Sequence, residues 1–205
     1  MKKQNFIVAA LKAGFVIPFL YYGIQIIAAL FYPGYNFITM IASDLGSTSA
    51  PYPLIFNIGI IVLGACAILA AVGVLLVLKS LGVNMIVAWL TGLSVFCFGV
   101  GTLLAGIFPL PNPLHNNPFS IAGIILPFLF AIAMWKLSIS TATKIYFVAA
   151  SLLSIVFIPV LMGAFPVNVE NYAGILQRIS SLFSFPSIAV ATYLLIQRIE
   201  KKIEP

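Results

Sequence analysis

The chain has 205 residues, of which 62% are hydrophobic and 7% are charged, whereas soluble domains average about 45–50% apolar and about 25% charged residues. Ten basic and four acidic side chains cannot cover the surface of a soluble globule, so the composition excludes a soluble enzyme and a disordered tail. Two cysteines are too few for a secreted disulfide scaffold. The net charge of +6 would suggest nucleic acid as the partner of a soluble chain, but this composition predicts an integral membrane protein with no nucleic-acid partner.

Six apolar runs are each long enough to cross a bilayer as an α-helix, which takes about 20 residues. They occupy residues 5–31, 54–78, 85–108, 118–136, 145–165 and 173–197. Pro53 and Pro118 stand where the second and fourth runs would begin, and the first turn of a helix tolerates proline. The sequence therefore predicts an all-α integral membrane bundle of six transmembrane helices, with residues 1–205 forming a single domain.

The positions of Lys and Arg predict the orientation of this bundle. In a six-span arrangement, nine of these residues fall on the side of the two termini, and only Arg178 falls on the other side. Cytoplasmic loops of membrane proteins are enriched in Lys and Arg. We therefore expect a multi-pass protein of the cell membrane with both its N-terminus and its C-terminus in the cytoplasm.

Most of the polar residues that are hard to explain fall on the outer side of this arrangement. Asp44 lies in the loop after the first span, Asn57 lies about one turn inside the second span, and His115 lies in the second outer loop. Gln177 and Arg178 lie in the outer part of the sixth span. The sequence therefore predicts an outward-facing polar pocket that these five side chains line.

Arg178 would lie about 10 Å inside the sixth span, because it follows Asn171 by seven residues. A charge in a span costs about 2.5–3.5 kcal/mol on insertion scales, so it normally has a partner. We favour Asp44 over Glu170 as that partner, because Glu170 would point to a different side of the same helix. Three interpretations stay open: Arg178 reaches back to the outer headgroups, forms a structural ion pair with Asp44, or holds an anion or lipid phosphate.

His115 is the only histidine of the chain. One imidazole cannot supply both axial ligands of a buried haem, and it cannot form a zinc site without further ligands. We therefore expect no metal and no cofactor. The ring could act as a general acid or base near neutral pH, or, more commonly, bond the loop backbone. The chain has no G-x-S-x-G, H-E-x-x-H, phosphate-loop or dinucleotide motif, and whether it is an enzyme stays open.

Several short motifs, taken in order, resemble those of a known family. They are Ser43-Asp44-Leu45-Gly46, Phe56-Asn57-x-Gly59, Gly106-x-Phe108-Pro109, His115 and Gly174-x-x-Gln177-Arg178. Over essentially its whole length the chain resembles the six-helix prokaryotic membrane family called domain-of-unknown-function family 998. That family looks distantly similar to damage-regulated autophagy modulator and GPI-anchor lipid-remodelling membrane proteins. Many relatives carry acidic residues where this chain has Leu110 and Pro111, which argues against a metal or acid–base role for that loop.

These observations lead to three functional hypotheses. In the first, the outer pocket binds an anionic or lipid headgroup, with Arg178 as the anion contact and Asp44 as its orienting counter-charge. In the second, the protein is a lipid-modifying enzyme that transfers an acyl group or a headgroup with His115 as the base. In the third, it is a non-catalytic accessory or assembly subunit of a membrane complex. The expected partners are a membrane lipid and either a second copy of the chain or another membrane-complex subunit.

Overall fold

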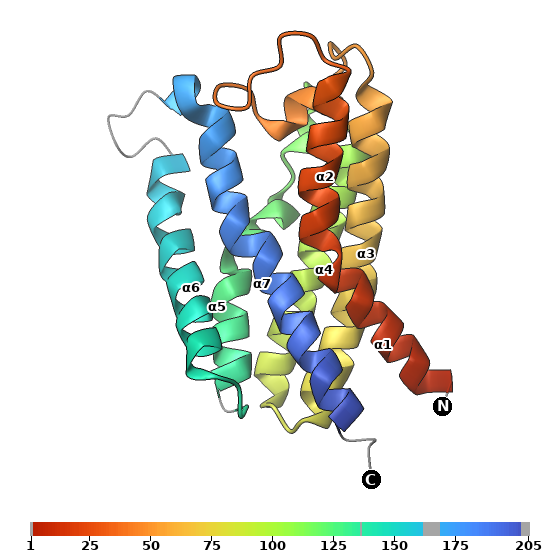
Figure 1. Cartoon of the computed structure of the whole chain (residues 1–205), viewed down its shortest axis with the longest axis vertical. Coiled ribbons are helices and arrows are strands. Elements are labelled where there is room, and N and C mark those ends of the chain that lie inside the picture. Colours follow the sequence, from red (N-terminus) through yellow and green to blue (C-terminus); the bar gives the residue numbers. More distant parts are fainter. Residues whose placement is uncertain (1, 136, 162–168, 202–205) are drawn as a thin grey trace.

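The computed structural model describes residues 2–135, 137–161 and 169–201, which are helical or form turns and connecting loops. Its seven α-helices within these ranges are α1 (Lys2–Phe15), α2 (Ile17–Leu30), α3 (Pro53–Ser80), α4 (Met85–Ile107), α5 (Ala122–Trp135), α6 (Thr141–Leu161) and α7 (Ala173–Lys201). Four short 3-10 helices lie in the connections: η1 (Ala42–Gly46), η2 (Pro113–His115), η3 (Pro118–Ile121) and η4 (Val169–Tyr172). The α-helices run along one bundle axis, and both termini lie at the same end (Figure 1). We call the opposite end the distal end.

The first apolar run forms two helices rather than one. α1 and α2 meet at Val16 and are bent by 43° relative to each other. Pro18, in the first turn of α2, has no N–H to donate to the carbonyl of Gly14, so the hydrogen-bond ladder is interrupted at this point. Such an interruption accounts for a sharp bend. The pair together is long and apolar enough to form one span.

The structure supports four to five membrane-spanning segments. α3, α4, the Pro113–Trp135 stretch and α7 each pass the length and hydropathy requirement, and the bent α1–α2 pair makes the fifth. α6 contributes a shorter apolar helical segment, Thr141–Val156. The predicted end of the fifth apolar run, residues 162–165, lies outside the described residues. The chain is therefore a multi-pass helical membrane protein.

Small residues allow α3 and α4 to pack with their backbones almost in contact. A Cβ atom on Gly64 would lie 2.7 Å from the carbonyl oxygen of Gly99, and a Cβ on Gly99 would lie 2.9 Å from the carbonyl oxygen of Gly64. Near the distal end, a Cβ on Gly106 would lie 2.9 Å from the Asn57 carbonyl. Close packing of this kind is the main source of helix association within a bilayer. This helix pair forms a rigid wall beside the polar site.

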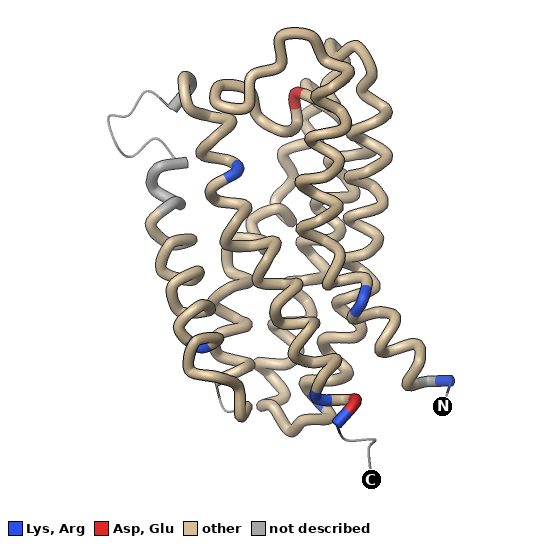
Figure 2. The backbone as a smooth tube through the Cα atoms, viewed as in Figure 1, with Lys and Arg blue, Asp and Glu red and all other residues tan. Residues whose placement is uncertain are grey.

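Basic residues gather toward the end of the bundle that carries the termini (Figure 2). At this end, the Lys79 ammonium lies 5.5 Å from the ring centre of Trp89, and the Lys144 ammonium lies 5.5 Å from that of Trp135. Lys–Trp pairs suit a membrane interface, where the indole ring sits at headgroup level and the ammonium reaches water.

The loop between α2 and α3, residues 31–52, covers the distal end of the bundle (Figure 1). We call it the first loop. It contains η1, which packs against α2, α3 and α7. Leu45 anchors η1 in the core, where its side chain is 2% exposed. The first loop thereby brings residues 42–46 down between helices that are distant in the sequence.

Candidate functional site

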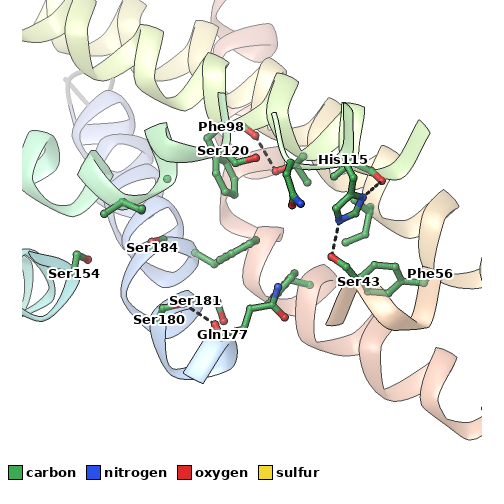
Figure 3. A pocket seen from close by; sticks show the side chains of 18 residues that line it. Ser43, Phe56, Phe98, His115, Ser120, Ser154, Gln177, Ser180, Ser181 and Ser184 are labelled. Carbon is green, nitrogen blue, oxygen red and sulfur yellow. Dashed lines mark hydrogen bonds between the residues drawn. The ribbon is translucent and has the colours of Figure 1, made fainter. Parts of the chain in front are cut away.

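A cavity of about 300 Å³ lies in the distal half of the bundle, and residues of α2 to α7 and of η1, η2 and η3 contribute to its wall (Figure 3). Apolar side chains such as Phe56, Phe98 and Phe185 form part of the lining. Hydroxyl, amide and imidazole groups form the polar part. Among the described residues that line the cavity, none is an Asp, Glu, Lys or Arg. The cavity therefore offers hydrogen bonds without formal charge.

His115 and Ser43 face each other at one end of the cavity (Figure 3). The Nδ1 atom of His115 lies 3.0 Å from the carbonyl oxygen of Ala105 and 3.1 Å from that of Phe108. Because carbonyl oxygens only accept hydrogen bonds, Nδ1 carries a proton. In the neutral ring Nε2 is then the acceptor, and the Ser43 hydroxyl, 2.8 Å away, donates to it. The tautomer and the orientation of the ring are thus fixed by the backbone at the end of α4.

Gln177 lines the same cavity from α7. Its Oε1 atom accepts a hydrogen bond of 2.6 Å from the backbone N–H of Ala42, the residue before Ser43. This bond fixes which end of the amide is oxygen and which is nitrogen. The Nε2 group has no hydrogen-bond partner among the described residues. Gln177 therefore ties η1 to α7 and leaves two N–H donors beside the cavity.

A row of serines continues the polar lining along α7. Gln177, Ser180, Ser181 and Ser184 stand at positions i, i+3, i+4 and i+7, so they share one face of the helix. The Ser180 hydroxyl donates to the carbonyl of Gln177, and the Ser181 hydroxyl lies 2.8 Å from the hydroxyl of Tyr22. The sequence contains this polar stripe, although the five predicted site residues included only Gln177.

Ser154 lines the cavity from α6, and Figure 3 places it far from the Ser43–His115 pair. Its side chain is 6% exposed, and its hydroxyl oxygen is buried without a hydrogen-bond partner in the described part of the chain. A buried polar group without a partner costs about 1–3 kcal/mol. Ser184, 9% exposed, likewise makes no side-chain hydrogen bond within the described residues. These hydroxyls are available to a molecule that enters the cavity.

Arg178 does not line the cavity and does not pair with Asp44. Its Nη1 donates to the carbonyls of Phe37, Met40 and Gly174, at 2.9, 3.0 and 2.8 Å. Nη2 donates to the hydroxyl of Tyr35 at 2.5 Å. The guanidinium also lies 4.8 Å from the ring centre of Phe37. An ion pair with Asp44 was one of the three interpretations left open by the sequence. Instead, Nη1 and Nη2 donate to backbone carbonyls and to the Tyr35 hydroxyl, and the buried Nε atom has no hydrogen-bond partner among the described residues.

Asp44 acts as a local cap of η1. Its Oδ2 atom accepts a 2.8 Å hydrogen bond from the backbone N–H of Ile41, just ahead of the 3-10 helix. Burial raises the pKa of this carboxyl group, and the Ile41 hydrogen bond and the charge of Arg178 lower it by less. The carboxylate thus contributes to the turn of the first loop and lies outside the cavity lining.

Asn57 joins α3 to the same turn. Its Nδ2 atom donates a 2.9 Å hydrogen bond to the carbonyl oxygen of Gly46. A Cβ atom on Gly46 would lie 2.1 Å from the Asn57 Oδ1 atom, so only glycine allows this approach. Of the five predicted site residues, the structure places His115 and Gln177 in the cavity wall, and Asp44, Asn57 and Arg178 in the contacts that hold the first loop. Ser43 belongs to the Ser43-Asp44-Leu45-Gly46 motif, but nothing in the sequence identified His115, 72 residues away, as its hydrogen-bond partner.

Together these features define a helical, multi-pass integral membrane protein with an uncharged polar cavity in its distal half. The chain belongs to the family described as Protein of unknown function (DUF998), whose model matches residues 15–194. This match confirms the family resemblance, and the family motifs converge on η1 in the structure. No curated protein and no solved structure matches the chain.

Proposed function

We propose that the protein binds the polar headgroup of an uncharged lipid in the cavity that residues of α2 to α7 line. The observation that carries this proposal is the buried hydroxyl of Ser154, which borders the cavity. Within the described part of the chain, this hydroxyl has no protein partner and the cavity has no charged lining residue. A bound hydroxyl or ester group would offset the cost of that unpaired group. We do not favour an anionic headgroup, because Arg178 lies outside the cavity lining and directs four hydrogen bonds to the protein itself.

The dimensions and position of the cavity favour a headgroup over a whole lipid or a water-soluble metabolite. About 300 Å³ is the lower end of the usual range for small-molecule pockets, which extends to about 1,000 Å³. Phenylalanine and isoleucine side chains share the wall with the hydroxyl and amide groups. A molecule with one polar end and one apolar end matches such a lining, and a membrane lipid is present at this depth.

The proposal includes a topology of six spans in the cell membrane, with both termini in the cytoplasm and the cavity toward the outer leaflet. α6 would form the fifth span. Two observations support this arrangement: both termini lie at one end of the bundle, and most Lys and Arg positions lie toward that end (Figure 2). The enrichment of basic residues in cytoplasmic loops then places the distal end outside.

The headgroup site can be tested by replacing Ser154 with alanine and measuring lipid binding. The purified protein in detergent micelles would be titrated with a fluorescent monoacylglycerol and, separately, with fluorescent phosphatidylglycerol. Losing one hydrogen bond of about 1–1.5 kcal/mol should weaken monoacylglycerol binding about 5- to 12-fold in Ser154→Ala. Phosphatidylglycerol should bind more weakly than monoacylglycerol to the wild-type protein.

Ser151→Ala is the matched control for this experiment. Ser151 lies one turn away on α6, and its hydroxyl donates to the carbonyl of Phe147 within the helix, so it does not face the cavity. We expect this variant to bind monoacylglycerol with wild-type affinity. Equal affinities of Ser154→Ala and the wild-type protein would refute the proposed headgroup site, and so would a preference for phosphatidylglycerol.

A further inference from the structure

We infer that Ser43 and His115 form a nucleophile–base pair that transfers an acyl group from an uncharged lipid ester bound in the cavity. This inference rests on the proposed headgroup site and adds a reaction to it. Its basis is a chain of three contacts: the Ser43 hydroxyl to Nε2 of His115 at 2.8 Å, and Nδ1 of His115 to two backbone carbonyls at 3.0 and 3.1 Å. A nucleophile, a base and a group that orients the base are the three parts of an activated serine.

The arrangement of the base is suited to proton transfer. The carbonyls of Ala105 and Phe108 hold the proton on Nδ1, so the lone pair of Nε2 points at the Ser43 hydroxyl. His115 is 9% exposed, which removes most competing water from the ring. The two carbonyls also stabilise the imidazolium that forms when the ring takes a proton. Each of these features strengthens a general base without needing a carboxylate partner.

Two uncharged side chains are placed to stabilise the negative charge of a tetrahedral intermediate. Gln177 is held by its bond to the N–H of Ala42, one residue before the nucleophile, and keeps both Nε2 hydrogens free of protein partners among the described residues. Asn116 follows His115 directly and also lines the cavity. Figure 3 shows Gln177 near Ser43 in the same pocket. Amide N–H donors of this kind form oxyanion holes in acyl-transfer enzymes.

The reaction proceeds in two balanced steps. In the first, His115 Nε2 takes the proton of Ser43, the serine oxygen bonds to the ester carbonyl carbon, and the bond from that carbon to the alcohol oxygen breaks. The imidazolium returns the proton to the departing alcohol, which leaves an acyl ester on Ser43. In the second step, water or another alcohol attacks this ester with His115 again as the base, and the Ser43 hydroxyl is restored.

The cavity indicates which lipid ester would react. The pair lies at one end of the cavity, and the unpaired hydroxyl of Ser154 and the side chain of Ser184 lie away from it (Figure 3). An acylglycerol could place its ester at Ser43 and its free hydroxyls at these serines. The absence of charged residues from the described lining disfavours phospholipid headgroups. We therefore assign an uncharged acylglycerol ester as the substrate class.

The first test uses the wild-type protein and a fluorophosphonate probe, which forms a covalent bond with activated serines. The full chain in detergent micelles would be treated with the probe, digested and mapped by mass spectrometry. We expect the adduct on Ser43. Ser43→Ala should abolish it, and His115→Gln should slow it at least about 100-fold, the usual contribution of a general base.

Ser47→Ala provides the matched control for labelling. Ser47 lies one turn further along the first loop, and its hydroxyl is occupied by the Asp44 carbonyl and by Ser49. It does not line the cavity, so the variant should be labelled at the wild-type rate. Because the adduct is mapped on the wild-type protein, the result does not depend on whether a variant folds. An unlabelled Ser43, or an adduct on another serine, overturns the inference.

A second test measures the release of fatty acid from monoacylglycerol. Gln177→Glu keeps an oxygen for the N–H of Ala42 but removes both Nε2 donors, and losing one oxyanion donor lowers kcat about 10²- to 10³-fold in known enzymes. The variant should therefore turn over at least about 100-fold more slowly while unfolding at the wild-type temperature. Monoacylglycerol binding without labelling of Ser43 would refute the reaction alone. Labelling of Ser43 with wild-type lipid affinity in Ser154→Ala would refute the headgroup site alone.

Discussion

Replacing Arg178 with alanine should release the first loop from α7. Three of the hydrogen bonds of this side chain cross from the helix to the loop, two to the backbone carbonyls of Phe37 and Met40 and one to the Tyr35 hydroxyl. A hydrogen bond to a charged group contributes about 1.5–3 kcal/mol, and the guanidinium–Phe37 ring contact adds about 0.5–1 kcal/mol. Because the guanidinium is partly exposed, the lower values apply. The two bonds to backbone carbonyls and the ring contact alone correspond to about 3–4 kcal/mol, so we expect Arg178→Ala to lose at least this much unfolding free energy.

The loss can be measured by thermal unfolding in detergent micelles. For a chain of this length, each kcal/mol shifts Tm by about 2–4 °C, so the transition of Arg178→Ala should fall by about 10 °C. Arg178→Lys should recover little of this, because an ammonium cannot reproduce the planar set of donors that reaches several acceptors at once. Limited proteolysis should show faster cleavage within residues 31–41 in both variants.

Arg198→Ala is a matched control on the same helix. Arg198 lies near the other end of α7, and its hydrogen bond goes to the carbonyl of Ser138 at the surface. We expect this variant to unfold within about 1 kcal/mol of the wild-type protein. If Arg178→Ala is no less stable than Arg198→Ala, the guanidinium does not hold the first loop and our reading of the Gly174-x-x-Gln177-Arg178 motif is incorrect.

Two further predictions concern the same loop. Asp44→Asn should be at least as stable as the wild-type protein at neutral pH, because it keeps an acceptor for the N–H of Ile41 and buries no charge. Asp44→Ala should lose about 1 kcal/mol of unfolding free energy, measured by thermal unfolding, and equal losses in the two variants would instead indicate that Asp44 acts through its charge. Because burial raises the pKa of Asp44 above its ordinary value of 3.8, the folded state keeps this proton to higher pH than the unfolded state. The stability of the wild-type protein should therefore fall as the pH rises above 3.8, and this fall should be smaller in Asp44→Asn. Gly174→Ala should lose more than about 2 kcal/mol of unfolding free energy, since the added Cβ would clash with the Met40 carbonyl oxygen. In the control variant Gly23→Ala the added Cβ would have nothing within 4 Å, so this variant should be neutral or stabilising. Similar transition temperatures for the two variants would exclude a tight contact at Gly174.

Much of the helical architecture follows directly from the sequence. Apolar runs long enough to span a bilayer predict the positions of α3, α4 and α7 to within a few residues. The family was also identified correctly from the sequence, since its model matches residues 15–194. The bend between α1 and α2 also follows from the sequence, because Pro18 lies inside the first apolar run and a proline inside a helix interrupts its hydrogen-bond ladder.

The site was harder to predict, because its contacts join residues that are far apart in the chain. An arginine in a span needs hydrogen-bond acceptors. The sequence shows where Asp and Glu residues are, but it does not show which backbone carbonyls will point toward the arginine. Arg178 finds such carbonyls in the first loop, 138 and 141 positions earlier. The partnership of His115 with Ser43 likewise depends on how η1 folds back. The polar face of α7 is the exception, since its spacing at Gln177 and the following serines is visible in the sequence alone.

An uncharged cavity wall has a consequence for a protein that sits in an energised membrane. The transmembrane voltage acts on net charge, with about 2.3 kcal/mol per elementary charge for each 100 mV. A molecule without charge experiences almost none of this force in a cavity whose described lining has no Asp, Glu, Lys or Arg, and mobile ions have no charge to screen there. Occupancy of the cavity should therefore be the same in resting and depolarised cells, and at low and high ionic strength.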